Sequence, residues 1–262
     1  MSLVYLITSL PRVHRGEPPP ITRAELVQRC RDNLHGGDRA EFELLLQTES
    51  VEETVRLSLN AQLAGLDAEA TVSSIVNERR DGVPLDRLQP WLLRPGPQHE
   101  LLRRHYYDVT QRARTEFLVR WANFRVDIGE VVTAVLCRQE GRSRDEFLVQ
   151  MQGNFDASAP RIIANWEDPL LGLGSRFGWV PRVVKALGEE DMIAMSRTLD
   201  DVLWERIEAL TPTETFRIET VLALYLHLRI AERQAQWSAE KGAQMLERIL
   251  AATAPSPSQV QR

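Results

Sequence analysis

The sequence predicts an all-α protein, built as a multi-helix bundle with a short extended segment at its N-terminus. Three observations support this prediction. Helix-start signals recur along the chain, and apolar residues repeat at helical spacing between Phe117 and Leu136. After residue 10, no segment shows the alternation of apolar and polar residues that a half-buried strand requires.

The composition is that of an ordinary soluble globular protein. The chain has 262 residues, of which 43 % are hydrophobic and 26 % are charged, enough for one large domain or two smaller ones. A net charge of −5 gives no general attraction to phosphate backbones, so we expect no nucleic-acid partner. Cys30 and Cys137 stand far apart without a CxxC motif, which predicts buried free thiols in a reducing compartment.

The first part of the chain begins with a β-branched and aromatic run. Val4 to Ile7 predicts a short strand or an extended arm, and no basic residue precedes it as in a signal peptide, so we expect a cytoplasmic protein. Gly16 to Pro20 is a stiff connector that no helix can cross. Helices are then predicted from capping-box spacings and end-glycines, which are Thr22 with Glu25, Asp38 with Glu41, Ser50 with Glu53, Gly36 and Gly65.

A weaker helix is predicted over 68–80, and the proline-rich stretch 81–97 marks the best domain boundary. We therefore expect an N-terminal arm and helical lobe over 1–96, a main helical lobe over 97–252 and a disordered tail over 253–262. The main lobe opens with a long amphipathic helix from Phe117 to a glycine at Gly141. Further helices are predicted at 144–152, 158–167, 179–187, 190–209, 212–236 and 239–251.

The helix at 212–236 has the most distinctive sequence. Thr211 occupies the N-cap place, Pro212 the first helical position and Glu214 the third position after the cap. The run from Val221 to Leu226 is apolar on every face, but it is far shorter than the ~20 residues that a membrane span needs. We therefore expect this helix to pack inside its own fold.

No catalytic or metal-binding motif is evident, so neither a cofactor nor a metal is expected. The GLGSRFG stretch (172–178) follows no strand and lacks the GxGxxG spacing, which favours a loop between helices. The acidic residues Asp200, Asp201 and Glu205 could bind magnesium on one face of a helix. However, arginines lie close to them in the sequence, and a solvated charged face explains the pattern equally well.

The scattered histidines and the HYYDV turn (105–109) show no spacing typical of a catalytic site. The five histidines, His14, His35, His99, His105 and His227, have no Cys, Asp or Ser partner at a telling spacing. Tyr106 and Tyr107 are expected to pack in the core or at an interface.

Three segments, taken in order, resemble a bacterial family of V/A-type rotary ATPase proteins, the C-like proteins of the central stalk. Phe216 to Gly242 resembles the C-terminal segment of that family. Leu3 to Pro11 is similar to its opening, and Phe117 to Gly141 to its central helix. The central helix departs from the family pattern, because Arg125 stands in the place of a Glu and Glu130 in the place of an Asn, with Gly129 between them.

The resemblance implies a funnel-like helical bundle in the central stalk of a rotary ATPase. Such a protein would couple the rotor axle to the membrane proteolipid ring, for ion transport linked to ATP synthesis or hydrolysis, without binding nucleotide. It would be cytoplasmic and peripheral to the inner membrane through the complex. Residues expected at the partner interface are Glu219, Arg229, Glu232 and Arg233.

Two other classes of function stay open. One is a free-standing helical adaptor with unrelated partners, since fold alone does not fix function. The other is a magnesium-dependent helical enzyme built on Asp200 and Asp201.

Overall fold

The computed structural model describes residues 3–63, 98–150, 158–189, 191–214 and 216–236. Within these ranges the chain forms helices and loops, and no strand is present. The helices are α1 (Leu3–Ser9), α2 (Arg23–Asn33), α3 (Gly36–Leu63), α5 (Gln98–Arg112), α6 (Glu116–Gln139), α7 (Arg144–Gln150), α8 (Ala159–Ala164), α9 (Val180–Gly188), α10 (Met192–Leu210) and α11 (Ile218–Gln236).

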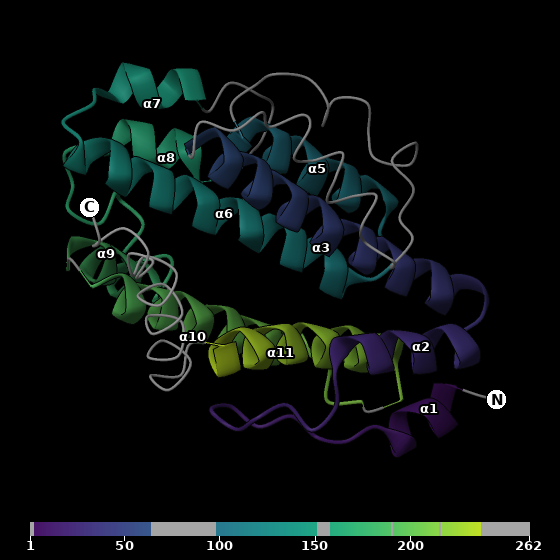
Figure 1. The fold of residues 1–262 in the computed structure, drawn as a ribbon. Helices are drawn as coiled ribbons and strands as arrows, with labels where there is room; N and C mark the ends of the chain where they lie inside the picture. The colour runs from purple at the N-terminus through teal and green to yellow at the C-terminus, as the bar shows by residue number, and fades with distance from the viewer. Residues whose placement is uncertain (1–2, 64–97, 151–157, 190, 215, 237–262) are drawn as a thin grey trace, which may run out of the picture.

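The described helices form two layers that meet along α6 and α11 (Figure 1). The upper layer consists of α3, α5 and α6 side by side, with α7 and α8 next to α6. The lower layer contains α1, α2, α9, α10 and α11. Contacts of α6 with α9 and α10, and of α11 with α3, join the two layers.

The core lies mainly where α6 and α11 face the other helices. From α6, Leu118 and Val131 are completely buried, and Trp121 is nearly so. From α11, Val221 and Leu222 are completely buried, which confirms that this helix packs inside its own fold. Each buried side chain of this size stabilises the fold by roughly 1.5–3 kcal/mol.

The N-terminal segment is a helix, so the predicted strand or extended arm is wrong. The Thr8 hydroxyl donates to the backbone carbonyls of Val4 and Tyr5, as happens in helices. Leu6 is buried, and Leu3, Ile7 and Leu10 pack against the core at a spacing of three to four residues. The helical period of these apolar residues outweighs the β propensity of Val4 and Tyr5.

Two of the three capping-box predictions also fail. Thr22 does cap α2, because its hydroxyl accepts a hydrogen bond from the Glu25 amide at 3.1 Å. The segments predicted to start at Asp38 and Ser50 are instead parts of the single helix α3. The buried residues Leu44, Thr48, Val51 and Val55 continue one helical face across the predicted break.

The helix predicted at 212–236 begins later, at Ile218. Thr211 ends α10 instead of starting α11, since its amide donates to the carbonyls of Ile207 and Glu208 and its hydroxyl to Ile207. Pro212 has no amide hydrogen to extend α10. Glu214 binds Arg217 at 3.2 Å instead of closing a capping box.

The other described helices of the main lobe confirm the predictions to within a few residues. The predicted loop around GLGSRFG connects α8 to α9. Within it Gly172 has a φ of +67°, and a Cβ there would meet the Asn165 side chain at 2.6 Å. Gly65, the helices predicted at 68–80 and 239–251, the stretch 81–97 and the tail at 253–262 lie outside the described residues.

Candidate functional site

A buried ionic network joins the two layers, and it is the most distinctive polar feature of the described residues. Glu49 and Glu52 lie one helical turn apart on α3, and their side chains are only 4 % and 5 % exposed. Arg229 of α11 reaches both carboxylates, with Nη1 2.5 Å from Glu49 Oε2 and Nη2 2.7 Å from Glu52 Oε2. One guanidinium of the lower layer therefore binds two carboxylates of the upper layer.

Arg125 of α6 completes the network from within the upper layer. Its Nε and Nη2 each donate to Glu52 at 3.2 Å, in the two-pronged geometry that suits an arginine and a carboxylate. Its Nε also donates to the Tyr106 hydroxyl at 3.0 Å. Two carboxylates and two guanidinium groups thus neutralise one another at the junction of α3, α6 and α11.

The two carboxyl groups of this network differ in pKa. Burial acts to raise the pKa of Glu52, but Arg125 and Arg229 outweigh it and hold the pKa below its usual value. Burial dominates at Glu49 and raises its pKa to about 7, although Arg229 opposes the shift. Nearby, burial lowers the pKa of His105 to about 4, so this imidazole is neutral at physiological pH.

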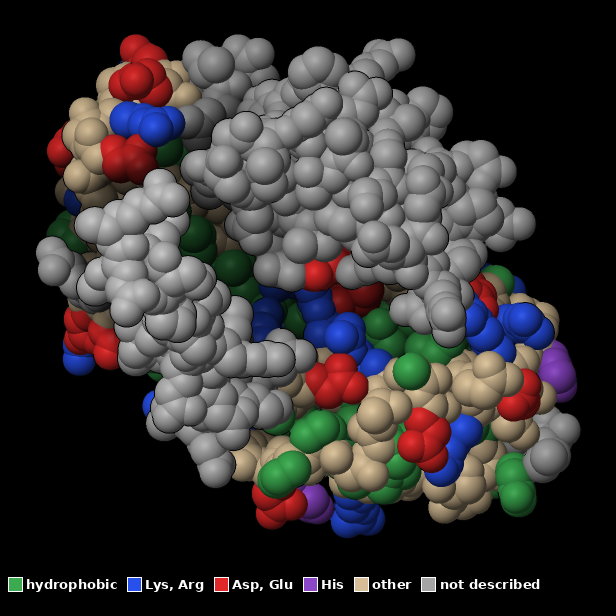
Figure 2. Space-filling view, in the orientation of Figure 1, with side chains coloured by type: hydrophobic (Ala, Val, Ile, Leu, Met, Phe, Trp, Pro, Cys, Tyr) green, Lys and Arg blue, Asp and Glu red, His purple; other side chains and the backbone are tan. Residues whose placement is uncertain are grey.

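The other charged residues of α11 pair with other helices of the lower layer. Glu232 accepts hydrogen bonds from the backbone amide and Nε of Arg23 on α2, at 2.7 and 2.5 Å. Arg233 donates to Asp200 on α10. Figure 2 shows basic side chains gathered in the crevice between the layers, with acidic side chains beside them.

These contacts place the four residues predicted for a partner interface. Arg229, Glu232 and Arg233 each bind a residue of the same chain, on α3, α2 and α10 respectively. Glu219 lies apart from them at the start of α11, 3.9 Å from Arg217. The contact of these residues with a partner protein stays a prediction.

The acidic residues predicted as a possible magnesium site are paired with arginines from three elements. Asp200 binds Arg233 of α11, and Asp201 binds Arg15 of the loop before α2. Glu205 lies 2.6 Å from Arg182 of α9 and 3.7 Å from Arg15. Searched over the described residues alone, the structure contains no group of three or more His, Cys, Asp or Glu side chains placed to hold a metal ion.

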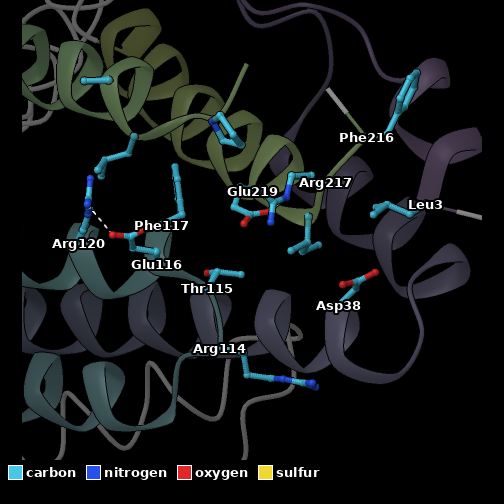
Figure 3. Close-up of a pocket in the computed structure, with 14 residues that line it drawn as sticks. Leu3, Asp38, Arg114, Thr115, Glu116, Phe117, Arg120, Phe216, Arg217 and Glu219 are labelled. Carbon is cyan, nitrogen blue, oxygen red and sulfur yellow. Dashed lines mark ion pairs between the residues drawn. The ribbon is translucent and has the colours of Figure 1, made fainter. Parts of the chain in front are cut away.

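An open pocket of about 520 Å³ lies where the start of α3, the α5–α6 turn and the α10–α11 loop come together (Figure 3). Its lining combines apolar side chains with charged ones, including the ion pair between Arg120 and Glu116 at 2.5 Å. Phe216 is 53 % exposed at its edge. The pocket is lined by Leu3, Asp38, Arg114, Thr115, Glu116, Phe117, Arg120, Ala209, Leu210, Pro212, Phe216, Arg217, Ile218 and Glu219.

The wall of this pocket is fixed by Glu41, a buried residue of α3. Its carboxylate accepts hydrogen bonds from the amides of Arg114 and Thr115 and from the Thr115 hydroxyl. Thr115 in turn caps α6 by accepting from the Leu118 amide. The Asp38–Glu41 spacing therefore has a tertiary role, since Glu41 orders the start of a different helix.

The remaining sequence predictions divide between buried and exposed positions. Cys30 and Cys137 are buried free thiols, as predicted. Tyr106 packs in the core, whereas Tyr107 is 47 % exposed. Glu130 is completely buried, and burial raises its pKa to about 7, although the start of α8 at Ser158 and Ala159 partly offsets the shift.

Sequence reasoning missed Glu49, Glu52 and Glu41. A signal for the first two is present, because they continue the buried face of Phe42 and Leu45 at spacings of three and four residues. Two carboxylates on an apolar helical face predict buried cationic partners, but the sequence does not identify Arg229 and Arg125 among thirty arginines.

A scan against protein families matches residues 97–254 to the family described as "Protein of unknown function (DUF2764)". The match covers more than half of the chain. This protein belongs to the DUF2764 family. No curated protein and no solved structure matches the chain.

The resemblance to the C-like central-stalk family is therefore wrong as an assignment, because the matching family is DUF2764 and no rotary-ATPase family matches. The structure explains why the residues were misleading. In Phe216–Gly242 most of the apolar residues that carried the resemblance, such as Val221, Leu222 and Leu228, are buried on α11. Residues that only fill a core recur in unrelated helical proteins.

Proposed function

We propose that this DUF2764 protein is a non-catalytic helical protein that holds its partners in a fixed relative position. The assembly we propose is a V/A-type rotary ATPase, in which the protein would couple the rotor axle to the proteolipid ring. The proposal concerns the role of the protein, not membership of the C-like central-stalk family.

The observation that carries this proposal is the buried network of Glu49, Glu52, Arg125 and Arg229. Buried ion pairs add little net stability, because desolvation of the charges offsets their attraction. They do require one geometry, since a shift of α11 along α3 would leave carboxylates buried without partners. A protein that transmits torque needs this kind of fixed helix arrangement within a densely packed body.

A second observation is compatible with this role. None of the helices in the described ranges has the length and apolar character that crossing a membrane requires. In the proposed assembly the membrane-embedded part is supplied by the proteolipid ring, and this protein would reach the membrane only through the complex.

The test is capture of the full-length protein, tagged at its C-terminus, from gently solubilised native membranes. We expect head, axle and proteolipid subunits to be recovered in fixed proportion, and to be lost when the tag is expressed alone. Recovery of the protein without any of these subunits would overturn the rotary-ATPase proposal.

The second candidate is a free-standing helical adaptor, and the pocket beside Phe216 favours it. An exposed aromatic at the edge of a partly apolar pocket is typical of protein-binding surfaces. The adaptor would be supported if the capture experiment recovered a reproducible partner outside any rotary ATPase.

The magnesium-dependent enzyme is the least supported alternative. Asp200 and Asp201 are already bound by Arg233 and Arg15, which would have to move before a cation could approach. If this alternative held, Mg²⁺ would raise the Tm of the protein, and replacing Asp200 and Asp201 with alanine would abolish that rise. We expect no Mg²⁺-dependent change in Tm.

A further inference from the structure

A row of stacked aromatic and arginine side chains lies where α6, α10 and the loop before α9 meet. Arg176 lies over Phe177, with its Cζ 5.2 Å from the ring centroid, and Phe177 stacks on Trp179 at 5.6 Å. Trp179 meets Phe124 edge to face at 5.6 Å, and Arg206 lies over Phe124 at 5.0 Å. We call these five residues the arginine–aromatic surface.

The cations at the two ends of this surface lack carboxylate partners. Over the ranges that the structure describes, neither Arg176 nor Arg206 forms an ion pair within 4 Å. Asp127 is close enough for both arginines to lower its pKa against the effect of burial. Its Oδ1, however, accepts a hydrogen bond from the Ser158 hydroxyl at 2.6 Å and reaches neither guanidinium within ion-pair distance.

Arg206 is also in an unfavourable electrostatic environment. The residue is half-buried, its Nε is shielded from solvent, and this atom has no hydrogen-bond partner in the structure. Burial lowers the pKa of Arg206, and the positive charge of Arg120 lowers it further. An arginine held in this way is stabilised by any anion that approaches its exposed side.

We propose that the arginine–aromatic surface binds a carboxylate-rich segment of a partner protein. Two guanidinium groups at the ends of an aromatic row can each bind a carboxylate through paired hydrogen bonds, while the rings accept the apolar parts of the segment. Arginine, tryptophan and other aromatic side chains dominate the binding energy of protein interfaces. A long polyanion such as nucleic acid fits less well, because the whole chain carries a charge of −5.

This inference does not depend on the rotary-ATPase proposal, because its test uses neither native membranes nor ATPase components. The probe is a fluorescein-labelled peptide of alternating glutamate and alanine, and the matched control peptide carries glutamine in place of glutamate. Binding to the full-length protein is followed by fluorescence anisotropy at low and at physiological salt.

We expect the glutamate peptide to bind and the glutamine peptide to bind at least about tenfold more weakly, since charge-assisted contacts are lost. The double variant Arg176→Ala/Arg206→Ala should reduce the affinity for the glutamate peptide by about tenfold or more. Arg142→Ala is the matched control, because Arg142 is exposed and already bound to Glu140 at 2.7 Å. This control should leave the affinity unchanged.

Thermal unfolding distinguishes a binding role from a structural one. If Arg206 serves partner binding, Arg206→Ala should leave the Tm unchanged or raise it, because the substitution removes a poorly compensated cation. A clear fall in Tm would instead show that stacking on Phe124 is structural, and would overturn the proposal.

Three binding results would overturn it as well. These are equal affinity for the two peptides, unchanged affinity in the double variant, and tighter binding of a single-stranded oligonucleotide than of the glutamate peptide. The last result would assign the surface to nucleic acid instead of protein.

Discussion

The acidic residues of α3 and α10 have opposite environments, although both sets bind arginines from other parts of the fold. On α3, Glu49 and Glu52 are nearly inaccessible to water and share Arg229. On α10, Asp201 is 33 % exposed and its partner Arg15 is 40 % exposed. The same kind of pairing therefore fixes geometry at one place and has little effect at the other, because the cost of losing a partner grows with burial.

The largest effect is expected from Arg229→Ala. This change leaves Glu49 and Glu52 buried with only Arg125 nearby, and breaking a buried pair in this way costs about 3–5 kcal/mol. The free energy of unfolding can be measured by urea denaturation. The matched control is Arg217→Ala on the exposed Glu214 pair, which should change stability by less than about 1 kcal/mol.

A triple variant sharpens this test by removing the charges together. Glu49→Gln/Glu52→Gln/Arg229→Met leaves fewer unpaired buried charges, so it should be less destabilised than Arg229→Ala alone. If the triple variant were the less stable of the two, the attraction within the network would exceed its desolvation cost.

The next largest effect concerns Glu130, which is buried without a comparable arginine network. Its pKa is raised to about 7 from an ordinary value of 4.5. Protonated Glu130 therefore stabilises the fold fully below about pH 4.5, and this contribution is lost as the pH rises through 7. Between pH 5 and 8 the loss should be on the order of 2–3 kcal/mol.

Glu130→Gln keeps the shape of the side chain and removes its titration. Relative to the wild type, the variant should gain stability between pH 5 and 8, measured by urea denaturation at several pH values. A difference between variant and wild type that does not change with pH would contradict the raised pKa of Glu130. Because Glu49 titrates in both proteins, its contribution cancels in this difference.

A smaller effect is expected from Asp200→Asn, which weakens the bond to Arg233. Asp200 is 4 % exposed, but the guanidinium of Arg233 is 36 % exposed and partly hydrated. We expect a loss of about 1–2 kcal/mol, discounted for this exposure. Thermal unfolding measures the change, and a loss as large as that of Arg229→Ala would show that exposure does not control these pairs.

The smallest effect is expected one residue further along α10. Asp201→Asn removes an exposed pair with Arg15, so stability should change by no more than about 0.5 kcal/mol. Asp200 and Asp201 thus form a matched pair of sites on one helix. A larger loss at Asp201 than at Asp200 would reverse the comparison between buried and exposed acidic residues.

The sequence predicted those features that depend on neighbours along the chain. The helix from Glu116 to Gln139 follows from the spacing of its apolar residues, and the Thr22 cap from a local hydrogen bond. The N-terminal helix and the start of α11 were mispredicted because tertiary packing and the cap at Thr211 override local propensity.

The candidate site was largely beyond sequence reasoning for the same reason. Arg229 and Glu52 lie 177 residues apart, and no local pattern indicates that they meet. Arg229 itself was singled out as a charged residue of α11, but its buried partners on α3 were not. The arginine–aromatic surface likewise joins residues from α6, α10 and the α8–α9 loop.

The ion pairs made by α11 also bear on how the chain folds during synthesis. Arg23 and Glu52 emerge from the ribosome early, but their partners Glu232 and Arg229 follow 209 and 177 residues later. Until then the acidic face of α3 can stay hydrated only if the two layers remain apart. Docking of the layers is therefore expected as a late, post-translational step, and nascent chains that end before α11 should be held by chaperones or degraded.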